Sequence, residues 1–220
     1  MTLAEQAPEL HLTVLNTALS ALGCAVNHGM APSRRLAVID YSLPSSERRM
    51  WIFDLRIQRL LMQEYVAHGR NTGENFAVSF SNELGSNQSS LGLFRAAESY
   101  DGRNGYSLRL DGLERGVNDR ARERAIVIHG ADYVNPDWID QQGRIGRSEG
   151  CPALREQVAR IVIDDLKQRQ LVFAYAEDAS WLQRGRSFAC DGRSAGQIIA
   201  AARAGLPMGG GAQTASVAAP

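Results

Sequence analysis

The sequence predicts a β-rich α+β domain, and three observations support this fold class. The chain has 220 residues, which is enough for one domain with appendages and a well-buried core. Most of its apolar runs are short and are separated by polar turns, as is typical of strands. Only two longer stretches show helical periodicity, one near the N-terminus and one after the middle of the chain.

The first predicted element is an amphipathic helix over residues 9–28, which ends before the break at Pro32 and Ser33. We expect this N-terminal part, residues 1–31, to pack on a domain that covers residues 32–190. The Gly- and Ala-rich end of the chain, residues 204–220, is low in complexity and is predicted to be disordered.

The strands follow the helix in order. Polar turns separate the first three, which predicts an antiparallel meander, and a last strand is expected to close the sheet. The expected strands are 36–41, 50–55, 60–66, 93–95, 106–110, 125–129 and 171–175. A helix is predicted from Pro152 to about Gln168, because proline is well tolerated at a first helical position. Two long loops, 69–92 and 130–150, interrupt these elements, and long loops in compact domains tend to be functional.

Composition excludes several classes of function. Lysine plus arginine and aspartate plus glutamate number 24 each, so no net charge favours nucleic acid as a partner. No run is long enough to span a membrane, no CxxC pair suggests zinc, and we expect neither a metal nor another cofactor. The N-terminus does not resemble a signal peptide, because Glu5 and Glu9 occupy the region where basic residues are expected.

Two of the three cysteines are predicted to have no role in catalysis. Cys24 belongs to the apolar pattern of the N-terminal helix, which favours a buried, unreactive thiol. A bridge between Cys24 and Cys190 is the alternative.

The strongest chemical signal is the combination of His129 and Cys151. His129 ends the apolar run 125–129, and Cys151 stands in a tight turn between Gly150 and Pro152. A cysteine becomes a good nucleophile when a base and a helix N-terminus lower the pKa of its thiol. The spacing therefore predicts a cysteine acyltransferase, although each residue alone is also typical of an ordinary core position.

Other polar residues near these two have both a functional and a structural interpretation. His68 closes a strand and is expected either to line the same cleft or to be a surface histidine. Ser148 is favoured as a turn-forming residue. Arg144 and Arg147 could bind substrate carboxylates, or they could simply be solvated.

Three segments resemble the second branch of the YkuD superfamily, the murein L,D-transpeptidase catalytic domain family. They are the segments 89–94, 129–134 and 146–154, with the pattern of histidine, loop and Ser-x-Gly-Cys. The resemblance covers about residues 34 to 176. It implies a YkuD-like mixed sheet or sandwich with an N-terminal helix and one helix after the catalytic cysteine.

The resemblance also implies the roles of individual residues. Cys151 would be the nucleophile that forms a thioester with a peptidoglycan stem peptide, and His129 the general base and acid. The Gly130 carbonyl would orient the imidazole, and the backbone at Gly150 and Cys151 would hold the oxyanion. Substrate contacts are assigned to Ser148, Arg147, His68, Ser90 and Tyr133.

The reaction implied is cross-linking of donor and acceptor stem peptides in cell-wall synthesis, with consequences for cell shape. The alternatives are an L,D-carboxypeptidase that acts on tetrapeptide stems and an inactive wall-binding module. Glu149 and the pair Pro152-Ala153 depart from the better-known branch, which leaves the choice of acceptor open. The resemblance implies a monomer in the periplasm or cell envelope, while the missing signal peptide leaves the cytoplasm as the alternative.

Overall fold

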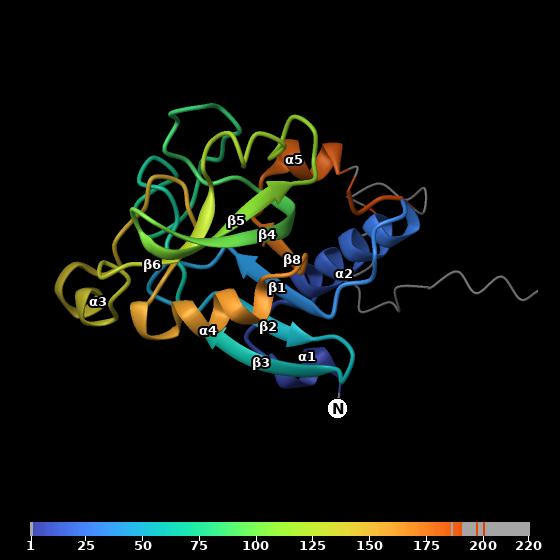
Figure 1. Ribbon diagram of the computed structural model, residues 1–220, viewed down its shortest axis with the longest axis horizontal. Coiled ribbons are helices and arrows are strands. Elements are labelled where there is room, and N and C mark those ends of the chain that lie inside the picture. Colours follow the sequence, from blue (N-terminus) through green and yellow to red (C-terminus); the bar gives the residue numbers. More distant parts are fainter. Residues whose placement is uncertain (1, 186, 191–196, 198–199, 201–220) are drawn as a thin grey trace, which may run out of the picture.

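A mixed sheet of eight strands, in the order β3-β2-β1-β8-β4-β5-β6-β7, forms the centre of the protein (Figure 1). The computed structural model describes residues 2–185, 187–190, 197 and 200. The strands are β1 (Arg35–Asp40), β2 (Met50–Asp54), β3 (Arg59–Glu64), β4 (Gly92–Gly102), β5 (Gly105–Gly112), β6 (Val127–Gly130), β7 (Ala153–Leu154) and β8 (Leu171–Tyr175). The β-rich α+β class predicted from the sequence is confirmed.

The predicted antiparallel meander is present as β1, β2 and β3. Every residue of β2 and all but the first of β1 are buried. The two strands are therefore nearly continuous apolar runs, without alternation of apolar and polar residues. Burial on both faces requires a covering layer on each side of the sheet. The helices supply those layers.

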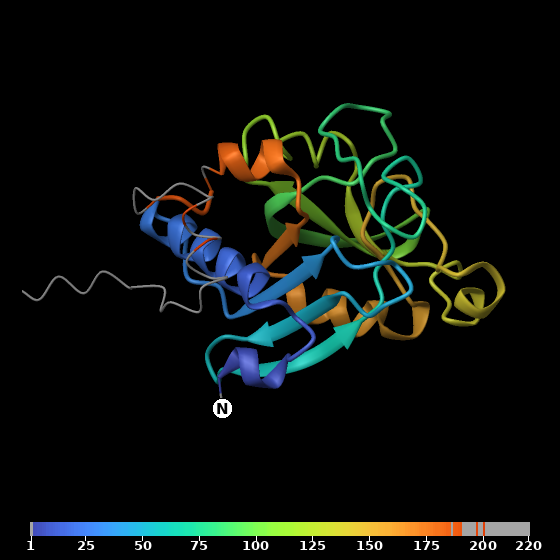
Figure 2. The ribbon, with the colours of Figure 1, turned by 180° about the vertical axis from the view of Figure 1, so that it is seen from behind.

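Helix α2 (Leu12–Asn27) and helix α4 (Glu156–Leu166) cover opposite faces of the sheet. Both contact β1, and α4 lies in front of the sheet in Figure 1, whereas α2 lies in front when the molecule is turned in Figure 2. Three short helices were not predicted: α1 (Leu3–Gln6), α3 (Asp137–Gln142) and α5 (Ala179–Arg184). Helix α3 lies within the predicted loop 130–150.

The prediction that residues 171–175 close the sheet is wrong. Strand β8 lies in the middle, parallel to β1 and antiparallel to β4. All five of its residues are buried, which fits a central position better than an edge.

The predicted helix start at Pro152 is also wrong. Residues Ala153 and Leu154 pair with β6 as the short strand β7, and α4 begins only at Glu156. The backbone N–H and C=O groups of these residues form hydrogen bonds with β6, so they are not available for the hydrogen bonds of a helix. Cys151 therefore precedes a strand and does not lie at a helix N-terminus.

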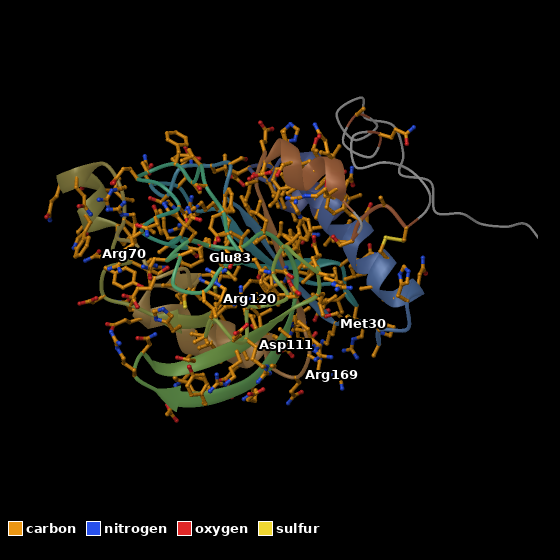
Figure 3. All side chains as sticks on the ribbon, turned by 90° about the horizontal axis from the view of Figure 1, so that it is seen from above. Met30, Arg70, Glu83, Asp111, Arg120 and Arg169 are labelled. Carbon is orange, nitrogen blue, oxygen red and sulfur yellow. A yellow bond between two sulfur atoms is a disulfide. The ribbon has the colours of Figure 1, made fainter. Side chains whose placement is uncertain are left out.

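Cys24 is not a free thiol, because it forms a disulfide with Cys190 across a sequence separation of 166 residues. Figure 3 shows this bond in yellow between α2 and the chain that follows α5. The returning chain packs its aromatic rings Trp181 and Phe188 against Phe173 of β8, and this brings Cys190 to the helix.

The predicted tail, residues 204–220, lies outside the described residues. In the described part of the chain, no helix combines the length and apolar character needed to cross a membrane.

Candidate active site

Two neighbouring strands bring His129 and Cys151 to one place. Strands β6 and β7 are parallel, and His129 pairs with Ala153. Val127 stands two residues before His129, Cys151 stands two residues before Ala153, and the Val127 N–H donates to Cys151 Sγ at 3.4 Å. His129 and Cys151 both line one cleft.

This cleft has a volume of about 490 Å³. Its walls come from the two long loops, from the β4–β5 turn and from the segment before β6. The lining residues are Arg70, Gly85, Asn87, Arg103, Asn104, Arg124, Ala125, His129, Tyr133, Arg147, Ser148, Glu149 and Cys151.

The Cys151 thiol is almost completely buried, with 9% of the residue exposed. Its Sγ–H donates to the Ala125 carbonyl oxygen at 3.6 Å. Burial raises the pKa of the thiol, while the Val127 N–H and the charge of Arg124 act to lower it. At neutral pH the free cysteine is therefore a thiol, because burial outweighs the groups that favour the thiolate.

The His129 imidazole is held in one orientation and is neutral at pH 7. Its Nδ1 lies 2.9 Å from the Gly130 carbonyl oxygen, which accepts only if Nδ1 carries the proton. Nε2 is then the ring nitrogen that can accept a proton. Burial lowers the pKa of His129 below its usual range.

The turn before Cys151 is held by Ser148. Its Oγ donates to the Cys151 carbonyl at 2.6 Å and accepts the Gly150 N–H at 3.1 Å. Gly150 has φ +118°, and a Cβ there would lie 2.8 Å from the Gln88 carbonyl oxygen, so only glycine fits. Since the Gly150 N–H is already used, the Cys151 N–H is the better donor for an oxyanion at this turn.

Both alternatives predicted for His68, a residue that lines the cleft and a surface histidine, are wrong. The side chain is fully buried and is not among the lining residues, and Arg49 Nη2 donates to Nδ1 at 2.7 Å while Nε2 lies 3.2 Å from the Gly73 carbonyl. Burial and the Arg49 charge lower the pKa of His68 to about 3. This neutral histidine supports the chain that precedes the loop 69–92.

Three further predicted substrate contacts have distinct positions. Tyr133 lines the cleft. Arg147 also lines it, but its Nη1 already donates to the Arg70 and Gly73 carbonyls and to Glu74. Ser90 is not among the lining residues, because its Oγ is buried and donates to the Ser81 carbonyl.

The neighbouring Arg144 also binds Glu74, at 3.1 Å. Both loop arginines that were considered for carboxylate binding are thus paired within the protein.

Sequence reasoning missed Arg124, which lines the cleft beside Cys151. No local motif distinguishes it from the other arginines of the chain. Its hydrogen-bond acceptors lie 34 to 43 residues away in sequence, so only the folded chain reveals them.

The part of the chain that the structure describes contains no group of three or more His, Cys, Asp or Glu side chains that could hold a metal ion. A larger cavity, of about 1270 Å³, lies between α2 and α5, but the cysteine that lines it is Cys24, which is bridged.

Comparison with known families agrees with this geometry. The family described as the L,D-transpeptidase catalytic domain, of the second YkuD type, matches residues 6–175. The chain belongs to this family. The match includes α2 and ends at the last residue of β8, so all eight strands of the described sheet lie within it. No curated protein matches the chain.

The chain is also similar to several solved structures. An L,D-transpeptidase from Mycobacterium smegmatis is 14% identical with a TM-score of 0.41, over 66% of this chain and 59% of that one. The helical cell shape determining protein Pgp2 from Campylobacter jejuni is 8% identical with a TM-score of 0.44, over 86% of this chain and 76% of that one. The chain thus matches less than two thirds of the length of the Mycobacterium smegmatis protein.

Proposed function

We propose that the protein is a peptidoglycan L,D-transpeptidase that joins stem peptides through a thioester on Cys151. The observation that carries this proposal is the cleft that is lined both by the buried, free thiol of Cys151 and by the oriented, neutral imidazole of His129. Membership of the L,D-transpeptidase catalytic domain family supports the substrate class.

In the first half-reaction, His129 Nε2 takes the proton from Cys151 Sγ as the sulfur attacks the carbonyl carbon of the donor's L,D-amide. The oxygen of the tetrahedral intermediate becomes an anion, and the Cys151 N–H is placed to donate to it. Collapse of the intermediate breaks the C–N bond, and the imidazolium returns its proton to the leaving amine. The products are a thioester and a free D-amino acid.

In the second half-reaction, an acceptor amine attacks the thioester, and His129 removes its proton. The C–S bond breaks, the thiol is regenerated, and the two stems are joined by an amide. Water in place of the amine would give the carboxypeptidase reaction. Glu149 lines the cleft, its side chain is 64% exposed, and its Oε1 lies 3.7 Å from Arg70 Nη1, so a charged pair that an incoming amine could meet stands beside Cys151. We infer that this pair helps to select the acceptor.

The experiment is to incubate the purified protein with a carbapenem and, separately, with disaccharide-tetrapeptide. We expect a mass increase of one carbapenem per chain and the appearance of cross-linked dimers. Tripeptide release without dimers would identify a carboxypeptidase instead. A protein that neither acquires the adduct nor changes the muropeptides would be an inactive wall-binding module.

The pH dependence of the reaction provides a further prediction. The pKa of His129 is below the usual value of 6.5, so the imidazole stays a base at pH 6.5, where an ordinary histidine would be half protonated. We expect the acid midpoint of kcat/KM, which reports the free enzyme, to lie below pH 6.5. A midpoint at or above that value would contradict the buried, neutral base.

We also infer that the protein works in the cell envelope. The Cys24–Cys190 disulfide supports this location, because such bonds persist in oxidising compartments and are rare in the cytosol.

A further inference from the structure

Arg124 is the cation of the cleft that is fixed most firmly. Nη1 donates to the Ser81 carbonyl at 2.5 Å and to Ser90 Oγ at 2.6 Å. Nη2 donates to Ser86 Oγ at 3.0 Å and to the Gln88 carbonyl at 2.6 Å. All four acceptors belong to one segment, residues 81–90, which forms the end of the long loop. The arginine therefore fastens this segment to the chain that enters β6.

None of these four acceptors carries a negative charge. Of the other arginines that line the cleft, Arg147 binds Glu74, Arg70 lies beside Glu149, and Arg103 stands in the β4–β5 turn. The neighbouring Arg120 is paired with Glu83 and Glu123. The charge of Glu83 also attracts Arg124, but the four hydrogen bonds of this half-buried guanidinium go to neutral groups, so its positive charge acts on Cys151 in the cleft.

The field is needed at this point because the fold provides no helix N-terminus for the nucleophile. Cys151 precedes a strand, and the nearest helix begins at Glu156. Burial disfavours a charged sulfur, and the charge of Glu149 opposes it further. Tyr133 and His129, which also line the cleft, are neutral at pH 7, because burial raises the pKa of the phenol and lowers that of the imidazole. The other charged residues that line it are Arg70, Arg103 and Arg147.

We propose that Arg124 is a positioning residue that stabilises negative charge on Cys151 Sγ during acyl transfer and couples the segment 81–90 to the nucleophile. At the ends of β6 and β7 the sulfur has one backbone donor, the Val127 N–H. Arg124 adds a positive charge that favours the thiolate form of Cys151. The part of this inference that concerns acyl transfer rests on the proposed function. The effect of Arg124 on the pKa of the Cys151 thiol is measured independently of turnover.

The test measures the pKa of the Cys151 thiol from the pH dependence of its alkylation by iodoacetamide, with disulfide-bonded protein in which Cys151 is the free cysteine. For Arg124→Gln we expect the pKa to rise by about one unit, so that alkylation at pH 7 slows about tenfold. Arg124→Lys keeps the charge with fewer donors and is expected to stay within about threefold of wild type. Arg122→Gln, which removes an arginine of the same turn that is paired with Glu98 and Asp111, is the matched control and is expected to react as wild type.

A second pair of variants keeps Arg124 and so keeps the fold. Ser86→Asp places a carboxylate at Nη2, and Ser86→Asn is its uncharged counterpart. We expect only Ser86→Asp to raise the thiol pKa. An unchanged pKa in both Arg124→Gln and Ser86→Asp, or equal shifts in Arg124→Gln and Arg124→Lys, would overturn the proposal. A raised thiol pKa in a protein without transpeptidase activity would leave the role of Arg124 in place and refute the proposed function.

Discussion

Replacing Cys151 with alanine is expected to abolish both the carbapenem adduct and dimer formation, with a loss of turnover of about 10⁴- to 10⁶-fold. The reason is that Cys151 is the free cysteine of the chain and, in the proposed mechanism, the group on which the acyl intermediate forms. Intact-mass spectrometry after incubation with the carbapenem and muropeptide analysis after incubation with tetrapeptide measure the two losses.

Cys151→Ser is the more demanding variant, because it keeps the shape of the side chain. A hydroxyl has a far higher pKa than a thiol, and a neutral His129 is a weak base for it, so we expect turnover almost as low as that of alanine. Both variants should unfold at nearly the wild-type denaturant concentration, since the change is small in volume. An adduct of equal yield on Cys151→Ala would show that another group is labelled and would remove the basis of the mechanism.

Local sequence signals predicted those parts of the fold that depend on local burial. The runs at β1 and β2 consist almost entirely of buried residues, and their predicted bounds differ from the observed ones by about one residue. Strand β4 was predicted only at 93–95, although it extends to Gly102. Its outer half carries exposed polar residues such as Glu98 and is held by pairing with β5, which no local pattern records.

Pairing between distant segments also explains two wrong predictions near the site, the helix start at Pro152 and the placement of Cys151 at a helix N-terminus. Ala153 and Leu154 follow a proline and precede a helical pattern, but β6 takes them as a strand partner, so tertiary contacts override local propensity. The same contacts place the cysteine two residues before a strand. Sequence reasoning singled out His129 and Cys151 because predicted elements end or begin beside them, whereas Arg124 binds a segment that is remote in sequence.

Removing the disulfide is expected to lower the free energy of unfolding by about 3 to 5 kcal/mol in the variant Cys24→Ala/Cys190→Ala. The bridge closes a loop with a separation of 166 residues, for which the chain-entropy account gives about 5 kcal/mol. Partial compensation comes from Trp181, which donates to Glu114 at 3.0 Å, and from Phe188, so the chain after β8 keeps part of its packing without the bond. Urea unfolding monitored with and without dithiothreitol measures the difference.

Cys151→Ala is the matched control for this prediction, because it removes the free cysteine and keeps the bridge. Dithiothreitol should destabilise wild type and Cys151→Ala equally and should leave Cys24→Ala/Cys190→Ala unchanged. In denatured, unreduced wild type only the Cys151 thiol should react with a thiol reagent, whereas all 3 cysteines should react after reduction. Reaction of all three without reductant would contradict the bridge.

The labelling of Cys151 by a carbapenem should survive in the Cys24→Ala/Cys190→Ala variant below its unfolding transition. The bridge joins α2 to the chain after α5, whereas Cys151 lies in the chain between β6 and β7.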